Sequence, residues 1–127
     1  MIVADASVIV RGLERDGPAR LLLVDGNVQV PHVADQEVAQ ALRGQVIRGL
    51  VTASAAEERL VRYRRLGLRR FAAVNLLARV WSLRASLSAY DATYVALAEA
   101  LDCPLATADV RLTRAPGIAC EVIRVTA

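Results

Sequence analysis

The chain has 127 residues and a formal net charge of +3, and arginine supplies all 16 of its basic side chains. Because lysine is absent, a P-loop lysine and a Schiff-base mechanism are excluded. The longest uncharged stretch, residues 26–34, is far too short to span a membrane, so the hydrophobic share of 55% indicates a dense core or a buried partner interface.

The N-terminus and the cysteines bear on where the protein works. Residues 1–7 lack the basic region of a signal peptide and lead directly into strand-like sequence. Cys103 and Cys120 do not form a CxxC pair, and two cysteines are too few for a disulfide framework. We therefore expect a cytoplasmic protein with reduced thiols and no membrane association.

Short apolar strands alternate with helical segments along the whole chain. Strands are predicted at residues 2–4, 28–31, 104–107 and 121–125. Helices are predicted at residues 8–13, 18–23, 34–47, 55–66, 73–84, 89–101 and 111–114. This alternation predicts a single α/β domain over residues 1–127, with a short central parallel sheet flanked by helices on both faces.

The stretch from Ser88 to Asp109 carries an acid at each end of an apolar helix–strand unit. Ser88 and Asp91 have the spacing of a capping box. Only Glu99 is charged between residues 92 and 101, so this helix should be largely buried. Helical spacing puts four residues on one face: Tyr90, Tyr94, Leu97 and Leu101.

Four acids are expected at the carboxyl edge of the sheet, where α/β proteins form their sites. Asp5 follows the first strand, Glu37 begins the helix after the second, and Asp109 follows the strand at 104–107. Asp91 begins the helix before that strand, although the sequence shows no strand directly ahead of it. Each acid also has an ordinary role as a helix cap or a first-turn acid.

If the four carboxylates converge, they need a compensating cation. Two of them about 5 Å apart repel by about 3 kcal/mol at an effective dielectric constant of roughly 20. Ligands that are all oxygen suit Mg²⁺ or Mn²⁺, which can activate water for phosphoryl displacement. The hydroxyls of Ser7 and Thr107, each two residues from an acid, could orient a carboxylate or serve as a cap and a strand former.

In this order the four acids resemble those of the PIN-domain ribonucleases, and most closely the VapC-type toxins of type II toxin–antitoxin pairs. The resemblance covers essentially the whole chain and is carried by VADAS at Asp5, PHVADQEVAQALR at Glu37, LSAYDATYVALAEAL at Asp91 and CPLATADVRL at Asp109. It implies a PIN fold, Mg²⁺- or Mn²⁺-dependent cleavage of RNA, a homodimer and neutralisation by a cognate antitoxin.

The resemblance also assigns roles to residues. It matches Asp5, Glu37, Asp91 and Asp109 to the metal-binding acids of the family, and Ser7 and Thr107 to its hydroxyl residues. Two positions depart from the pattern. Ser86 stands where similar toxins often have Asn. Residues 110–112 follow Asp109 where some PIN nucleases carry a further acid, so the sequence is compatible with either one or two bound metal ions.

On this interpretation the chain cleaves single-stranded or loop RNA, and Arg84 and Arg111 are candidates to contact phosphates. The alternative is a catalytically weak PIN-like module that binds RNA or a partner. A haloacid-dehalogenase-like phosphatase is disfavoured, because Ser7 stands where that class needs a second acid. The arginine-rich residues 59–70 are expected on a solvated face, and Trp81 in the core.

Overall fold

The computed structural model describes residues 1–126 and contains a five-stranded, fully parallel sheet. The strand order is β3-β2-β1-β4-β5. The strands are β1 (Ile2–Ala4), β2 (Val28–Pro31), β3 (Arg69–Phe71), β4 (Leu105–Thr107) and β5 (Val122–Arg124). The predicted parallel α/β architecture is therefore confirmed.

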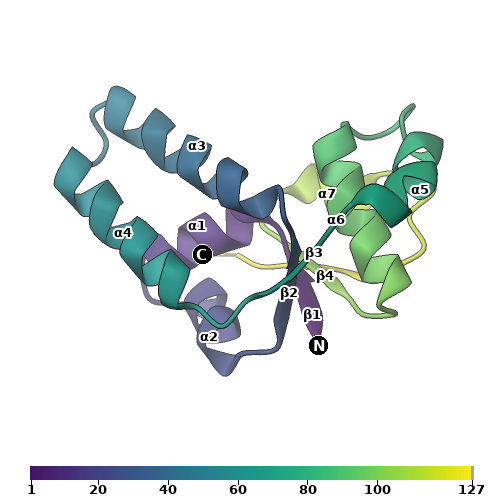
Figure 1. The fold of residues 1–127 in the computed structure, drawn as a ribbon, viewed down its shortest axis with the longest axis horizontal. Helices are drawn as coiled ribbons and strands as arrows, with labels where there is room; N and C mark the ends of the chain where they lie inside the picture. The colour runs from purple at the N-terminus through teal and green to yellow at the C-terminus, as the bar shows by residue number, and fades with distance from the viewer. Residues whose placement is uncertain (127) are drawn as a thin grey trace.

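Helices cover both faces of the sheet, which Figure 1 shows edge-on. On one side are α1 (Ala6–Glu14), α2 (Pro18–Asp25), α3 (Ala34–Ile47) and α4 (Ala53–Arg65). On the other are the 3₁₀ turn η1 (Val74–Leu76), α5 (Leu77–Ser82), α6 (Ala89–Ala100) and α7 (Val110–Arg114). Among residues 1–126, no helix is both long enough and apolar enough to cross a membrane.

Helix α6 is the buried element that the sequence predicts. Every residue from 92 to 98 is buried, because this helix packs against β1, β2 and β4 at the centre of the sheet. Tyr90 differs from the expectation. Its side chain is 59% exposed, although its spacing assigns it to the same face as the buried Tyr94.

Helices α1 and α2 pack closely together in the helix layer on the face of the sheet opposite α6. A Cβ atom on Gly12 would lie 2.5 Å from Leu23 Cδ1 and 3.2 Å from the carbonyl group of Ala19. Arg20 and Arg62 complete this corner: both donate hydrogen bonds to the Leu13 carbonyl, at the end of α1 where free carbonyls attract cations.

Strand β3 is absent from the sequence prediction, and it explains how α6 reaches the site. Arg69–Phe71 pairs with β2 through its backbone, with Val30 opposite Arg70. The side chain of Arg70 forms an ion pair with Asp35 at 2.9 Å. Because β3 ends at the carboxyl edge of the sheet, the chain passes to the other face from that edge, forms η1 and α5, and then begins α6.

The expected helix over residues 73–84 is wrong in detail. The segment is a 3₁₀ turn followed by the short α5, and Val80 is the buried residue of α5. Trp81 is 68% exposed, so its predicted place in the core is also wrong; the guanidinium of Arg84 lies 4.8 Å from its ring centroid. The N-cap of α4 is Thr52, whose side chain accepts a hydrogen bond from the Ala55 amide.

Candidate functional site

The candidate site lies where the order of the strands reverses. The chain proceeds from β1 to β2 and β3 on one side of the sheet, then crosses to β4 and β5 on the other side. Connections from β1 and β4 therefore diverge, and the crevice between them is the usual position of a site in an open parallel sheet. Asp5 follows β1 and Asp109 lies two residues past β4.

Asp5 is the most deeply buried of the four acids, with 5% of its surface exposed. It caps α1, because its Oδ1 atom accepts a hydrogen bond from the Val8 amide at 3.2 Å. The same oxygen accepts a hydrogen bond from the Ser7 hydroxyl, and Oδ2 accepts one from the Thr107 hydroxyl. Capping therefore accounts for only part of the contacts of this carboxylate.

The two hydroxyls also hold the β4 end of the site. Ser7 Oγ accepts a hydrogen bond from the Ala108 amide at 2.9 Å, and Thr107 Oγ1 accepts one from the Asp109 amide at 3.0 Å. Ser7 and Thr107 thus orient Asp5 and fix the backbone that carries Asp109. Both hydroxyls therefore contact Asp5, and Thr107 also lies in strand β4, as its other predicted role requires.

Glu37 enters the site from the first turn of α3. Its Oε1 atom accepts a hydrogen bond at 2.6 Å from the hydroxyl of Tyr94, which comes from α6. Sequence reasoning placed Tyr94 on a buried face and missed this role. The signal was present, because Tyr94 follows Asp91 by three residues and so lies on the same side of α6.

Asp91 and Asp109 begin helices at the other side of the crevice. The Asp91 amide donates to Ser88 Oγ at 3.1 Å, which is half of the predicted capping box. Asp109 caps α7 by accepting from the Arg111 amide at 2.9 Å. Asp109 also forms an ion pair with Arg111 at 2.7 Å, and among residues 1–126 it is the one candidate acid with an ion-pair partner.

The protonation equilibria show that the acids influence one another. Burial raises the pKa of Asp5, and the nearby charge of Asp91 raises it further against the hydrogen bonds that lower it. Burial also raises the pKa of Glu37, as do the charges of Asp91 and Asp5, while the Tyr94 hydrogen bond lowers it. Burial and then the charge of Asp109 raise the pKa of Asp91.

Asp109 behaves in the opposite way, because the hydrogen bonds from the Arg111 side chain and amide lower its pKa. The site thus combines three acids with raised pKa values and one that an arginine keeps ionised. The repulsion and burial of these carboxylates disfavour their ionised forms, and such perturbed pKa values are typical of functional sites rather than of simple helix caps.

The donor set has the chemistry that a hard divalent cation requires, since it offers carboxylate oxygens of mutually repelling acids. Even so, no three His, Cys, Asp or Glu side chains within residues 1–126 already form a group that could hold a metal ion. In this structure the Tyr94 hydroxyl donates to Glu37, and Arg111 forms an ion pair with Asp109. Metal binding by Asp109 would therefore compete with its ion pair to Arg111.

A pocket of about 420 Å³ opens beside these acids, between the start of α6 and α7. Asp91, Asp109 and Arg111 line it together with residues 86–88. A cation and two acids at one opening are suited to holding a phosphodiester next to the carboxylates.

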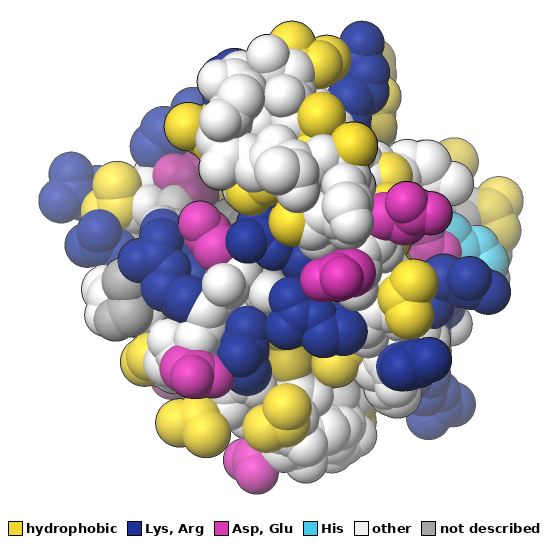
Figure 2. Space-filling view, turned by 90° about the vertical axis from the view of Figure 1, so that its left-hand side faces the viewer, with side chains coloured by type: hydrophobic (Ala, Val, Ile, Leu, Met, Phe, Trp, Pro, Cys, Tyr) yellow, Lys and Arg dark blue, Asp and Glu magenta, His cyan; other side chains and the backbone are white. Residues whose placement is uncertain are grey.

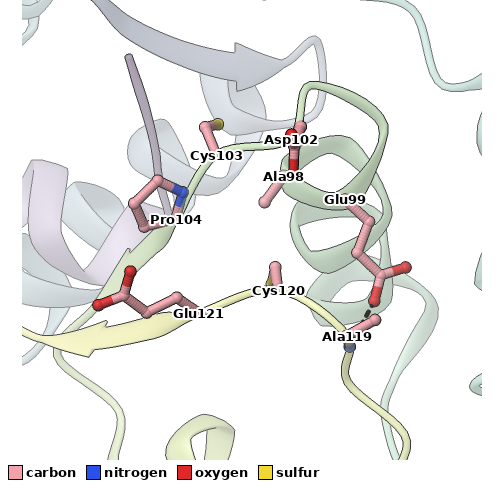
Figure 3. A pocket seen from close by; sticks show the side chains of 8 residues that line it. All are labelled: Ala98, Glu99, Asp102, Cys103, Pro104, Ala119, Cys120 and Glu121. Atoms are coloured by element: carbon pink, nitrogen blue, oxygen red, sulfur yellow. Dashed lines mark hydrogen bonds between the residues drawn. The ribbon is translucent and has the colours of Figure 1, made fainter.

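Another pocket, of about 390 Å³, lies at the opposite edge of the sheet, ahead of β4 and β5. Figure 3 shows Glu99, Cys103 and Cys120 among its lining residues. Both cysteines are free, as expected, and Glu99 is already engaged by Arg79 and the Ala119 amide. Because none of the four candidate acids lines this pocket, it is separate from the candidate site.

Most of the arginines in residues 59–70 are exposed, as expected, and two of those on α4 have hydrogen-bond partners on other helices. Figure 2 views the side of α2 and α4, where arginines spread across the surface with acidic side chains among them. Arg59 donates to Gln45 Oε1, and Arg62 donates to the Leu13 carbonyl. These residues contribute to packing between helices rather than to the acid crevice.

Comparison with known proteins identifies the class that this fold and acid crevice define. The PIN domain family model matches residues 2–118. Ribonuclease VapC9 of Mycobacterium tuberculosis is 45% identical over 122 residues, which cover 96% of each chain. The chain therefore belongs to the PIN domain family and, within it, to the VapC proteins.

Solved structures agree in fold. PAE2754 from Pyrobaculum aerophilum has a TM-score of 0.73 at 19% identity, with coverage of 95% of this chain and 81% of that one. VapBC2 from Rickettsia felis, bound to a DNA fragment from their promoter, has a TM-score of 0.71 at 13% identity and covers 99% and 100% of the two chains. The expected PIN fold is confirmed.

Proposed function

We propose that the protein is an Mg²⁺- or Mn²⁺-dependent endoribonuclease toxin that cleaves RNA in the cytoplasm and is neutralised by a cognate antitoxin. The observation that carries this proposal is the electrostatic coupling of the acids: burial and neighbouring acids raise the pKa values of Asp5, Glu37 and Asp91, and Asp91 and Asp109 line one pocket. The similarity to relatives named ribonucleases supports RNA as the substrate.

In this proposal the four acids would hold the divalent cation, which supplies activation of water and stabilisation of an in-line phosphoryl displacement. The chain's own residues do the positioning. Ser7 and Thr107 hold the Asp5 carboxylate, and Tyr94 holds Glu37. Such fixed orientation of the groups around a metal is needed for both affinity and rate.

Arg111 is the residue best suited to hold the scissile phosphate. It lines the same pocket as Asp91 and Asp109, and its side chain is 84% exposed. A guanidinium pairs with phosphate oxygens in the same bidentate way as with a carboxylate. We expect that substrate exchanges the Arg111–Asp109 ion pair for an Arg111–phosphate contact, which frees Asp109 toward the metal.

Cleavage of RNA with and without metal tests the proposal. Wild type should cut single-stranded or structured RNA in Mg²⁺ or Mn²⁺ and lose this activity in EDTA. Asp5→Asn should abolish cleavage, whereas the control Asp25→Asn, an exposed acid at the end of α2, should leave it unchanged. Full activity of the Asp5→Asn protein would contradict the assignment.

A second candidate is a catalytically weak PIN-like module that binds RNA or a partner. The observation in its favour is that no metal-holding group is preformed among the described residues, and Asp109 forms an ion pair with Arg111. Calorimetry with Mg²⁺ on wild type and Asp109→Asn separates the two. The nuclease predicts binding that Asp109→Asn weakens, and the binding module predicts none in either protein.

Exposed apolar side chains support a protein partner and a homodimer. They form three groups, on α2, at the α3–α4 connection with α4, and on η1 with α5: Leu21 and Val24; Ile47, Leu50 and Val61; Val74, Leu77 and Trp81. Structural neighbours described as toxin–antitoxin complexes support the antitoxin. The mass of the isolated chain from light scattering tests the homodimer. The presence of a small reading frame beside its gene tests the antitoxin.

A further inference from the structure

A pocket with apolar walls includes one of the candidate acids, and Arg111 does not line it. It has a volume of about 500 Å³ and lies between the starts of α1, α3 and α6. Its lining combines a ring, an acid, two amides and small apolar side chains: Tyr90, Glu37, Gln36, Gln40, Val33 and Ala41. Glu37 is therefore the candidate acid that this pocket contains.

Tyr90 has an exposure that the fold does not require. Its side chain is 59% exposed at the first turn of α6, immediately before Asp91. A tyrosine in this position exposes an aromatic face next to the acids, and an exposed aromatic face beside a phosphate site is the feature on which nucleobases stack.

The two glutamines add polar contacts at the edge of the same pocket. Gln36 and Gln40 are four residues apart, so they lie one above the other on a single side of α3, and both are exposed. A primary amide donates and accepts at the same time, which allows it to pair with the edge of a base. Apolar walls with amides at the rim match the flat faces and polar edges of a nucleobase.

The candidate acids line two pockets of different character. In one, Asp91, Asp109 and Arg111 line an opening suited to phosphate. In the other, Glu37 lies in the same lining as Tyr90, which directly precedes Asp91 in the chain. A strand laid across the acids would then place its backbone at Arg111 and one base in the neighbouring pocket.

We propose that the pocket formed by Tyr90, Gln36 and Gln40 binds one nucleobase of single-stranded RNA next to the scissile phosphate and sets the base preference of the enzyme. This subsite rests on the proposed RNA-cleaving function. Tyr90 stacks on the face of the base, and the amides of Gln36 and Gln40 bond to its edge.

The test uses a pool of single-stranded RNA with random sequence, and the bases flanking each cut are read by sequencing. Tyr90→Ala should lower kcat/KM about 5- to 100-fold, the usual effect of losing one stacked base. Tyr90→Phe keeps the ring and should resemble wild type. Gln36→Ala and Gln40→Ala should flatten the base preference at one position beside the cut.

Ala39→Ser is the matched control, because Ala39 is also an exposed residue of α3 but does not line the pocket. It should change neither the rate nor the base preference. Thermal melting of each variant excludes loss of folding as the cause, and the two glutamine variants test the subsite independently of any effect of Tyr90→Ala on stability.

Binding of a short fluorescent RNA separates failure of the subsite from failure of the proposed function. Weaker binding by Tyr90→Ala supports the subsite even if wild type cleaves nothing, in which case the nuclease proposal fails alone. Equal binding, cleavage and base preference in wild type, Tyr90→Ala and the glutamine variants overturn the subsite, and the pocket is then available to a protein segment. A wild type that neither binds nor cleaves RNA overturns both proposals.

Discussion

Replacing Thr107 by valine tests whether this hydroxyl holds the acid crevice together. Thr107 is fully buried, and its Oγ1 atom donates to Asp5 and accepts from the Asp109 amide. Valine has nearly the same shape, so the substitution removes the hydroxyl and its two hydrogen bonds without creating a large cavity.

The expected loss of stability follows from those two contacts. A hydrogen bond to a carboxylate contributes about 1.5–3 kcal/mol, and a buried amide left without an acceptor costs about 1 kcal/mol. Thr107→Val should therefore lower the free energy of unfolding by about 2.5–4 kcal/mol. The control Thr107→Ser keeps the hydroxyl and loses one methyl group, which costs about 1 kcal/mol.

Urea denaturation in metal-free buffer measures both changes as a shift in midpoint at constant slope. The reasoning requires Thr107→Val to be less stable than Thr107→Ser, and its cleavage of RNA to fall as the Asp5 carboxylate loses its orientation. If the valine variant is as stable as the serine variant, the hydroxyl does not organise the crevice and the account of Thr107 is refuted.

Two further predictions concern packing and charge. Gly12→Ala should lower the free energy of unfolding by about 1–2 kcal/mol, since the new Cβ would crowd Leu23. Gly44 has open space around it, so Gly44→Ala should raise the free energy of unfolding by about 0.5–1 kcal/mol. Equal effects of the two substitutions in urea denaturation would contradict this packing. The hydrogen bonds from Arg79 lower the pKa of Glu99, so this pair stabilises the fold above the ordinary Glu pKa, and the contribution is lost as the pH falls through the lowered value. Glu99→Gln should therefore cost more stability at neutral than at acid pH, and a loss independent of pH would refute the ion-pair explanation.

The sequence predicted four of the five strands because those strands are short runs of apolar residues in the centre or at one edge of the sheet. It missed β3 because Arg69 and Arg70 are exposed and show no alternation of apolar and polar residues. This segment becomes a strand through backbone pairing with β2, which only the folded chain provides. Because β3 was missed, the sequence showed no strand ahead of the α6 helix and could not place Asp91 at the carboxyl edge of the sheet.

The fifth predicted helix failed for a different reason. Apolar residues occupy more than one side of the segment around η1 and α5, so periodicity alone could not tell which side faces the core. Val80 faces inward, while Trp81 is exposed and carries Arg84 over its ring. An unusually apolar surface segment is indistinguishable from a core helix until its neighbours are known.

At the site, the residue types and topology were enough to nominate the acids and both hydroxyls. The contacts among them were beyond reach of the sequence, because they depend on side-chain directions. The hydrogen bond from Tyr94 to Glu37 joins residues that are 57 positions apart in the chain. The sequence is also compatible with an Asp109 that only caps a helix, without the ion pair to Arg111.

The central claim is that these acids hold the cation used to cleave RNA, and the dependence of cleavage on Mn²⁺ concentration in wild type and Asp91→Asn tests it most directly. Wild-type cleavage should rise with Mn²⁺, saturate and stop in EDTA. Asp91→Asn should need at least about tenfold more Mn²⁺ for half-maximal rate or show no cleavage, by analogy with the loss of affinity when metal sites are disturbed. An unchanged Mn²⁺ requirement and rate in Asp91→Asn, or wild-type cleavage that persists in EDTA, would contradict the account.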